Sequence, residues 1–532
     1  MQIRIVAFAA LVASLVPTLG ASTLGRAKHE YVVRTASGRV SGEVVPHAKV
    51  VVFKGIPYAA PPVGKLRWRA PQAVRPWKGI RRADHFSDSC VQETPNEFLP
   101  WTPAFMTHRK VSENCLYLNV WTPQASARAN LPVIVFIHGG AFTSGAGSIR
   151  IYNGTHLAQT GLVIVTINYR VGIFGFFAYP QLTAESRHHA SGDYGLLDQI
   201  AASRWVQRNI GAFGGDPHRV TIWGQSAGAM SVEALTLSPL AKGLFQRAQA
   251  DSGIGIRGFG APSLKTAESN GERFAQRVGA DSLKELRAIP AAKLLAAMRP
   301  SDEVGPDIDG WVLPASLRKL TADGSGSHVP LIAGWNANDW LLGSPPVSSV
   351  KAYQALAHRL YGTMSGEFLR LYPASTVGEA KAMEKLSSED RDRVSTYLWA
   401  VLREKSPSAR GPQPIYTYYF DRAIPWPEDP EFGAFHSSEL PYFFRNLKRM
   451  IRPWQPVDFK ISDEASAYLK NFAVTGNPNG QGLARWPGLS AGSPYSLRLG
   501  ARTGAMPLAT PARLAFWKKY FASPEAARAP IF

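Results

Sequence analysis

Short, continuous apolar runs, each followed by glycine or polar residues, are the clearest pattern along this chain. These runs are residues 131–137, 162–167, 220–223, 331–333 and 415–420. Runs of this length are typical of parallel strands that are buried on both faces. Residues 31–55 instead begin with an alternating pattern and a glycine break, which predicts a β-rich start.

The segments between these runs contain helical patterns. In residues 194–210, apolar side chains recur at near-helical spacing, and the Gly-Gly-Asp-Pro sequence at 214–217 ends the pattern. This alternation predicts the α/β class, with a large, mostly parallel, doubly wound sheet flanked by helices and a small N-terminal β subregion. Ligand sites in such sheets lie outside the carboxyl ends of the strands, so the functional residues are expected there.

The first 21 residues have the features of a secretory signal peptide. Arg4 supplies a positive charge, residues 5–16 are apolar, Pro17 interrupts them, and small residues follow. Because the apolar stretch is too short to span a bilayer, we expect cleavage and no stable membrane anchor. We find no Pro-, Gly- or Ser-rich linker, so residues 22–532 are predicted to form a single domain, secreted or periplasmic.

Composition and charge exclude several classes of protein. Hydrophobic residues make up 45% of the 532 residues and charged residues 18%, which excludes a disordered or fibrous chain. The net charge of +20 is scattered without a run of five basic residues, so we predict no nucleic-acid partner. The densest basic clusters, residues 108–110 and 445–452, motivate the hypothesis that the substrate is anionic.

The two cysteines, Cys90 and Cys115, are the only ones in the chain. An even number of cysteines in an exported protein favours a disulfide. We therefore expect them to pair and to close the loop of residues 91–114.

A candidate nucleophile lies in a G-x-S-x-G motif, which occurs twice. Residues 224–228 follow an apolar strand and enter a helix-compatible run, whereas residues 488–492 lie among turn-forming residues. Only the first context can build a sharp strand-to-helix turn that exposes a serine hydroxyl. Ser226 is therefore the predicted nucleophile, and Ser490 is interpreted as part of a structural turn.

A serine nucleophile needs hydrogen-bond donors for the oxyanion that forms during the reaction. The sequence His-Gly-Gly-Ala-Phe follows the strand at 131–137. We predict that the backbone N–H groups of Gly139, Gly140 and Ala227 form this oxyanion hole. His138 lies inside the same loop and is interpreted as structural.

The base and the acid are expected to follow the serine in the order acid, then histidine. Three histidines lie downstream: His328 precedes a strand, His358 lies in a helical pattern, and His436 follows the strand at 415–420 through a loop. We favour His436 as the base. Asp339 follows the strand at 331–333 and is the favoured acid, with Asp307 and Asp309 as alternatives.

Several further motifs occur in an order that resembles the type-B carboxylesterase/lipase family of α/β-hydrolases. They are residues 53–68 (FKGIPYAAPPVGKLRW), 112–120 (SENCLYLNV), 168–170 (NYR), 195–199 (GLLDQ), 213–217 (FGGDP) and 224–229 (GQSAGA). The resemblance covers nearly the whole mature chain. Two departures stand out, because Asn114 replaces the usual Asp, and Asp339 stands where most members have Glu.

The resemblance implies roles for individual residues. It implies the triad Ser226, Asp339 and His436 and the Cys90–Cys115 bridge. It also implies that Ser252 supports the triad. Structural ion pairs are implied between Arg67 and Glu113 and between Arg170 and Asp198.

These observations predict a carboxylic-ester hydrolase that works through an acyl-enzyme on a small-molecule ester. An amidase or peptidase on the same fold and a catalytically inactive binding module are the alternatives. We find no metal-ligand spacing or nucleotide motif and expect no cofactor. Candidate pocket residues are 253–257, Trp101, Trp335 and Trp340, although ordinary packing explains each of them better.

Overall fold

A sheet of 14 strands forms the centre of the protein in a computed structural model, which describes residues 31–95, 97–256, 258, 260–339, 347–407 and 411–528. The strands are β1 (Tyr31–Thr35), β2 (Gly38–Val45), β3 (Val50–Pro57), β4 (Ile80–Arg82), β5 (Tyr117–Thr122), β6 (Leu131–Ile137), β7 (Val163–Ile167), β8 (Gly215–Gln225), β9 (Arg247–Asp251), β10 (Leu331–Asn336), β11 (Ile415–Phe420), β12 (Gly488–Leu489), β13 (Tyr495–Leu499) and β14 (Gly504–Pro507). Their order is β1-β2-β3-β5-β7-β6-β8-β9-β10-β11-β13-β14, with β4 beside β2 and β12 beside β11.

The middle of the sheet is parallel and its edges are antiparallel. All neighbours from β7 to β13 in that order run parallel, whereas β1, β2, β3 and β5 pair antiparallel at one edge and β14 at the other. Four of the five predicted apolar runs fall within strands of the parallel part, and the run at 162–167 begins one residue before its strand, β7. The expected α/β class with a small N-terminal β subregion is therefore confirmed.

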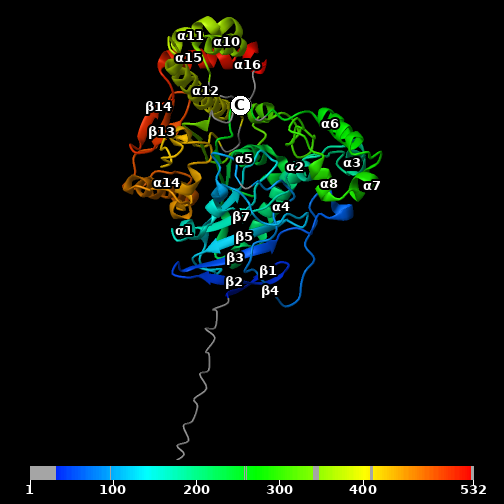
Figure 1. Cartoon of the computed structure of the whole chain (residues 1–532). Helices are drawn as coiled ribbons and strands as arrows, with labels where there is room; N and C mark the ends of the chain where they lie inside the picture. The colour runs from blue at the N-terminus through cyan, green and yellow to red at the C-terminus, as the bar shows by residue number, and fades with distance from the viewer. Residues whose placement is uncertain are drawn as a thin grey trace, which may run out of the picture.

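Sixteen α-helices of the described residues surround the sheet. They are α1 (Thr155–Ala158), α2 (Gly172–Gly175), α3 (Pro180–Glu185), α4 (Tyr194–Asn209), α5 (Ala227–Leu237), α6 (Leu264–Arg277), α7 (Leu283–Ala288), α8 (Ala291–Ala296), α9 (Leu317–Ala322), α10 (Val350–Tyr361), α11 (Ser365–Leu371), α12 (Val377–Lys405), α13 (Leu440–Phe443), α14 (Pro456–Thr475), α15 (Pro511–Phe521) and α16 (Pro524–Arg528). Figure 1 shows α14 and α1 on one side of the sheet and α4 on the other. The helices α10, α11, α15 and α16 gather at the top of the same view, and α12 leads from them towards β10.

Two hydrophobic cores fill the space between the sheet and its helices. Side chains of β6 alternate between them, because successive residues of a strand point to opposite faces. Val133 and Val135 belong to the core that contains α4 and α5. Ile134 and Phe136 belong to the core that contains α14. All four side chains are fully buried, so the apolar run at 131–137 reflects burial on both faces.

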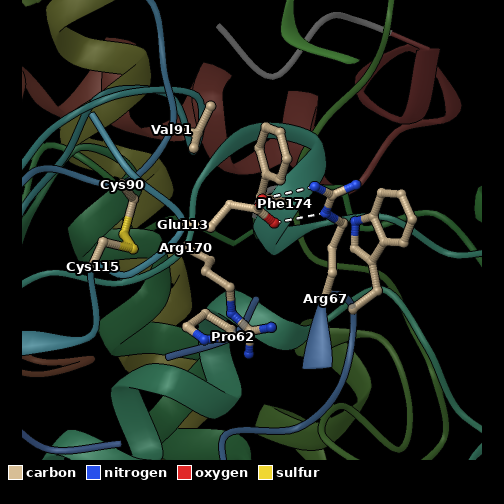
Figure 2. Close-up of a pocket in the computed structure, with 9 residues that line it drawn as sticks. Pro62, Arg67, Cys90, Val91, Glu113, Cys115, Arg170 and Phe174 are labelled. Carbon is tan, nitrogen blue, oxygen red and sulfur yellow. Dashed lines mark hydrogen bonds and ion pairs between the residues drawn. A yellow bond between two sulfur atoms is a disulfide. The ribbon is translucent and has the colours of Figure 1, made fainter. Parts of the chain in front are cut away.

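A disulfide and two ion pairs lie around one small cavity beside the sheet. Cys90 and Cys115 are bonded, with Cα atoms 5.0 Å apart, as expected. Nε of Arg67 lies 2.6 Å from Glu113, and Nε of Arg170 lies 2.7 Å from Asp198. Figure 2 shows the disulfide and the Arg67–Glu113 pair around a small cavity of about 10 Å³. The disulfide and both ion pairs implied by the resemblance are therefore present.

The predicted signal peptide, residues 1–21, lies outside the described residues. Among the helices that the structure describes, none has both the length and the hydrophobicity that a membrane span requires.

Candidate active site

Ser226 occupies the sharp turn between β8 and α5. Its backbone is held at φ 59° and ψ −127°, a conformation that non-glycine residues rarely adopt. The flanking glycines are required because a Cβ on Gly224 would lie 2.1 Å from the carbonyl oxygen of Gly228, and one on Gly228 would lie 2.1 Å from that of Ile137. The serine is partly exposed, and its own N–H donates to the carbonyl of Asp251 at 2.8 Å. The turn thus presents the hydroxyl of Ser226 at the carboxyl end of the sheet.

The glycine loop after β6 packs directly against this turn. A Cβ on Gly139 would lie 2.6 Å from the carbonyl oxygen of Gln225, and Gly140 has a φ of +106°. Within the described ranges, the N–H groups of Gly139, Gly140 and Ala227 donate to no acceptor of the protein. Three unused donors beside a serine are the arrangement that an oxyanion hole requires.

His138 has the surroundings of a structural residue. Its ring stacks on Tyr169 with centroids 4.3 Å apart, and its Nδ1 lies 2.8 Å from the carbonyl oxygen of Gly139. Burial lowers the pKa of His138 to about 4. The imidazole is therefore neutral near pH 7, and it is held inside the loop rather than towards the serine.

Asp339 and His436 meet at the neighbouring strand ends. Oδ1 of Asp339 lies 2.7 Å from Nδ1 of His436, and both side chains are buried. The second carboxylate oxygen accepts the hydroxyl of Ser252 at 2.8 Å and the backbone N–H of Asn336 at 2.7 Å. These contacts orient the carboxylate and leave the histidine proton on Nδ1. The structure therefore brings together the predicted acid, the predicted base and Ser252, the serine that the resemblance implies supports them.

The alternative residues lie elsewhere and have local partners. Oδ1 of Asp309 accepts three backbone N–H groups of residues 311–313, which makes it a turn cap. Nδ1 of His358 lies 2.8 Å from the hydroxyl of Ser365. Nε2 of His328 lies 3.2 Å from the carbonyl oxygen of Gly324.

Gln225 is a site residue that the sequence analysis did not single out. Its side-chain Nε2 lies 3.0 Å from Nε2 of His436 and can donate to the ring nitrogen that Asp339 leaves unprotonated. In the part of the chain that the structure describes, this amide and not Ser226 is the hydrogen-bond partner of that nitrogen. The available signal was only its position before the serine, where the G-x-S-x-G motif accepts any residue.

Two buried carboxyl groups lie behind Asp339. Burial raises the pKa of Asp251 to about 7, although Trp223 and Gln249 donate hydrogen bonds to it. Burial, with the charge of Asp251 adding to it, also raises the pKa of Glu439. Both groups therefore favour their protonated forms, which limits the negative charge that gathers around Asp339.

The candidate pocket residues are only partly described. The indole N–H of Trp101 donates to the carbonyl oxygen of His436 at 3.1 Å. The indole N–H of Trp335 donates to the hydroxyl of Thr396 at 2.7 Å. Trp340 and Arg257 lie outside the described residues. No group of three or more His, Cys, Asp or Glu residues in the described ranges is arranged to hold a metal ion.

Most cations of the two basic clusters are engaged locally. Arg109 donates to the carbonyl oxygens of Ser87 and Phe86 at 3.0 and 2.7 Å. In the second cluster, Arg445 pairs with Asp463 at 2.6 Å. Arg452 of the same cluster lies over the ring of Trp426, 3.8 Å from its centroid.

Comparison with known protein families, sequences and solved structures finds carboxylesterases and esterases in each case. A model of the carboxylesterase family matches residues 29–517. The chain is 35% identical to a fumonisin B1 esterase of Sphingopyxis macrogoltabida, covering 85% of this chain and 83% of that protein. It is also 35% identical to the para-nitrobenzyl esterase of Bacillus subtilis, covering 86% and 92%. Solved structures of a PNB esterase and a thermophilic PNB esterase, each 31% identical and covering 91% of this chain and 99% of their own, superpose with TM-scores of 0.75 and 0.77.

Proposed function

This chain belongs to the carboxylesterase family and is a serine hydrolase of ester bonds, and we propose that Ser226, His436 and Asp339 form its catalytic triad. The observation that carries the proposal is the contact of 2.7 Å between Asp339 and His436. It lies at the same edge of the sheet as the turn of Ser226, and Gln225, the residue before that serine, touches His436. An acid bonded to Nδ1 of a histidine, beside the turn that carries a serine, supports this assignment of the three roles.

Acylation uses the residues as follows. His436 takes the hydroxyl proton of Ser226 on Nε2 while Oγ forms a bond to the ester carbonyl carbon. The carbonyl electron pair moves to oxygen, where the N–H groups of Gly139, Gly140 and Ala227 stabilise the negative charge. When the tetrahedral intermediate collapses, the bond to the alcohol oxygen breaks and that oxygen takes the proton from His436. Asp339 keeps the other ring proton on Nδ1 throughout.

Deacylation repeats these steps with water. His436 removes a proton from a water molecule, whose oxygen attacks the acyl carbon. The same three N–H groups stabilise the second tetrahedral intermediate. Its collapse returns the proton from His436 to Oγ of Ser226 and releases the carboxylic acid.

Active-site labelling tests the nucleophile. A fluorophosphonate loses fluoride when an activated serine hydroxyl attacks its phosphorus, and the adduct is located by mass spectrometry. We expect the adduct on Ser226, no labelling of Ser226→Ala, and unchanged labelling of Ser490→Ala. An adduct on any other serine would overturn the assignment.

A short-chain aryl ester assayed beside the matching aryl amide measures whether the enzyme also cleaves amides.

The substrate is a small-molecule ester, and we propose that an anionic ester is favoured. The support is the net charge of +20 and the basic cluster at 445–452, which begins nine positions after His436. The similar proteins are named for quite different esters, so their names do not single out one substrate.

We also propose that the protein is exported, because residues 1–21 have the pattern of a signal peptide and the chain contains a disulfide.

A further inference from the structure

The loops that carry Asp339 and His436 follow two neighbouring parallel strands. Asp339 comes shortly after the end of β10, where Asn336 pairs with Phe420 of β11. His436 comes after β11 only by way of a longer loop. The contact between the acid and the base therefore depends on how this longer loop is held against the shorter one.

Asn338, the residue before Asp339, joins the two loops. Its backbone N–H donates to the carbonyl oxygen of Ala434 at 3.0 Å, and the N–H of Ala434 donates back to its side-chain Oδ1 at 3.1 Å. The side-chain amide of Asn336 adds a third bond, to the carbonyl oxygen of Phe435 at 2.9 Å. Asn338 is only 6% exposed, so water competes little for these bonds.

The longer loop is shaped to fit the amide of Asn338. Gly433 has a φ of +57°, and a Cβ on it would lie 2.5 Å from Oδ1 of Asn338. The backbone of residues 433–434 therefore lies directly on the side chain. A second donor reaches the same oxygen from α12, because Nζ of Lys385 lies 3.4 Å away.

We propose that Asn338 is a positioning residue that sets the distance between Asp339 and His436, an inference that rests on the proposed triad. The aspartate side chain has only two torsions, so it cannot follow the histidine if the loops separate. A displacement of about 1 Å from a productive geometry can cost on the order of 10²-fold in rate. The two bonds between Asn338 and Ala434 resist such a displacement directly beside the reacting groups.

The charged surroundings of Asp339 determine which test is informative. The carboxyl groups of Asp251, Asp392 and Glu439 act electrostatically on or with Asp339, and Lys385 approaches from α12. A neutral substitution at position 338 removes none of these titratable groups. A shift of the pH–rate profile in such a variant therefore reports the contact between Asp339 and His436.

The test compares Asn338→Ala with Asn338→Asp. We expect Asn338→Ala to lower kcat by about 10- to 100-fold with little change in KM. The acidic limb of its kcat/KM profile should move to lower pH, because the imidazolium loses part of its stabilisation by Asp339. Asn338→Asp keeps an acceptor for the N–H of Ala434 and adds a negative charge. It should retain kcat within about 10-fold and move the acidic limb to higher pH.

Asp339→Asn, assayed beside these variants, separates this inference from the proposed triad. If Asp339→Asn keeps full activity, the triad itself is wrong. If Asp339→Asn loses activity while Asn338→Ala keeps the wild-type kcat and pH profile, the triad stands and the positioning role is wrong. Equal losses in both Asn338 variants, without opposite shifts of the acidic limb, would also overturn the role. Should Asn338→Ala fail to fold, the kcat of Asn338→Asp decides: a kcat within about 10-fold of wild type supports the role of the retained acceptor, and a larger loss overturns it.

Discussion

Nε2 of Gln225 lies 3.0 Å from Nε2 of His436. Because Nδ1 of His436 faces Asp339, the ring presents its lone pair at Nε2, and the amide N–H of Gln225 can donate to it. That lone pair is the one that must accept the proton of Ser226 in the proposed mechanism. The amide therefore has to give up this hydrogen bond, or share it, whenever the serine reacts.

We expect Gln225→Glu to shift the pH dependence of the enzyme. A carboxylate at this distance would stabilise the protonated imidazole, so the acidic limb of kcat/KM should move up by about one pH unit or more. Gln225→Ala removes the hydrogen bond without adding a charge and is the matched control. Its acidic limb should move by much less. Superimposable profiles for wild type and Gln225→Glu would show that the side chain does not contact the base in solution.

Asp339→Asn should lower kcat by roughly 10³–10⁴-fold, because an amide can donate to His436 and favours the wrong tautomer. Asp339→Glu should retain far more activity, since its carboxylate still accepts from Nδ1. Steady-state kinetics with a short-chain aryl ester measures both. Asp307→Asn and Asp309→Asn are the controls and should change kcat little. A near-normal kcat in Asp339→Asn, with a collapse in either control, would assign the acid to Asp307 or Asp309.

The strands could be predicted where a continuous apolar run coincides with a buried strand. Residues 415–420 match β11 to the residue, whereas β8 begins at Gly215, earlier than its apolar run at 220–223. That earlier start depends on the pairing of Gly215 with Leu131, a long-range contact that the polar sequence there does not encode. Local pattern thus locates a strand, and its ends depend on its neighbours.

For the candidate site too, some residues could be predicted from the sequence and some contacts could not. Ser226, Asp339 and His436 could be singled out because each follows a predicted strand in the chain order of α/β-hydrolases. The contacts of Gln225 and Asn338 could not be predicted, because both depend on where the loop before His436 returns to the sheet. The sequence around Gln225 and Asn338 does not indicate which backbone or ring atoms of the distant loop before His436 will contact them.

Removing the disulfide should destabilise the protein. Closing a loop with a sequence separation of 25 residues stabilises by about 3.5 kcal/mol in the chain-entropy model. The double variant Cys90→Ser, Cys115→Ser should therefore have a clearly lower Tm by circular dichroism, while its kcat at low temperature stays close to wild type. Because the two sulfurs are bonded to each other, native wild-type protein should resist alkylation and yield one linked peptide. Two thiols alkylated under native conditions would contradict the pairing.

Glu233 of α5 should make stability depend on pH. Burial raises its pKa to about 8, with the charge of Arg403 opposing the rise. Between about pH 4.5 and 8 the folded protein keeps a proton that the unfolded chain has lost, so this group lowers stability as pH rises through that window. Glu233→Gln removes the effect. Its Tm should exceed that of wild type at pH 8 by several degrees more than at pH 5, whereas the exposed Glu93→Gln should show no such difference.

An anionic substrate should show a salt dependence that a neutral one lacks. A chain with 59 basic and 39 acidic residues attracts anions at long range, and salt screens this attraction beyond about 8–10 Å. For an acidic ester, kcat/KM should fall as ionic strength rises. For a neutral ester of the same alcohol, it should stay constant, which excludes a general effect of salt on the enzyme.

The variant Arg452→Gln tests whether the second basic cluster contributes to this attraction. Arg452 lies over the ring of Trp426. Trp426 belongs to the loop that leads from β11 to His436, so the charge of Arg452 lies against the loop that positions the proposed base. Removing one such charge should lower kcat/KM for the acidic ester at low salt and leave the neutral ester unaffected, because the change acts on association. The difference between wild type and variant should vanish at high salt. The same salt slope for both esters in the wild type would show that the positive charge does not select the substrate.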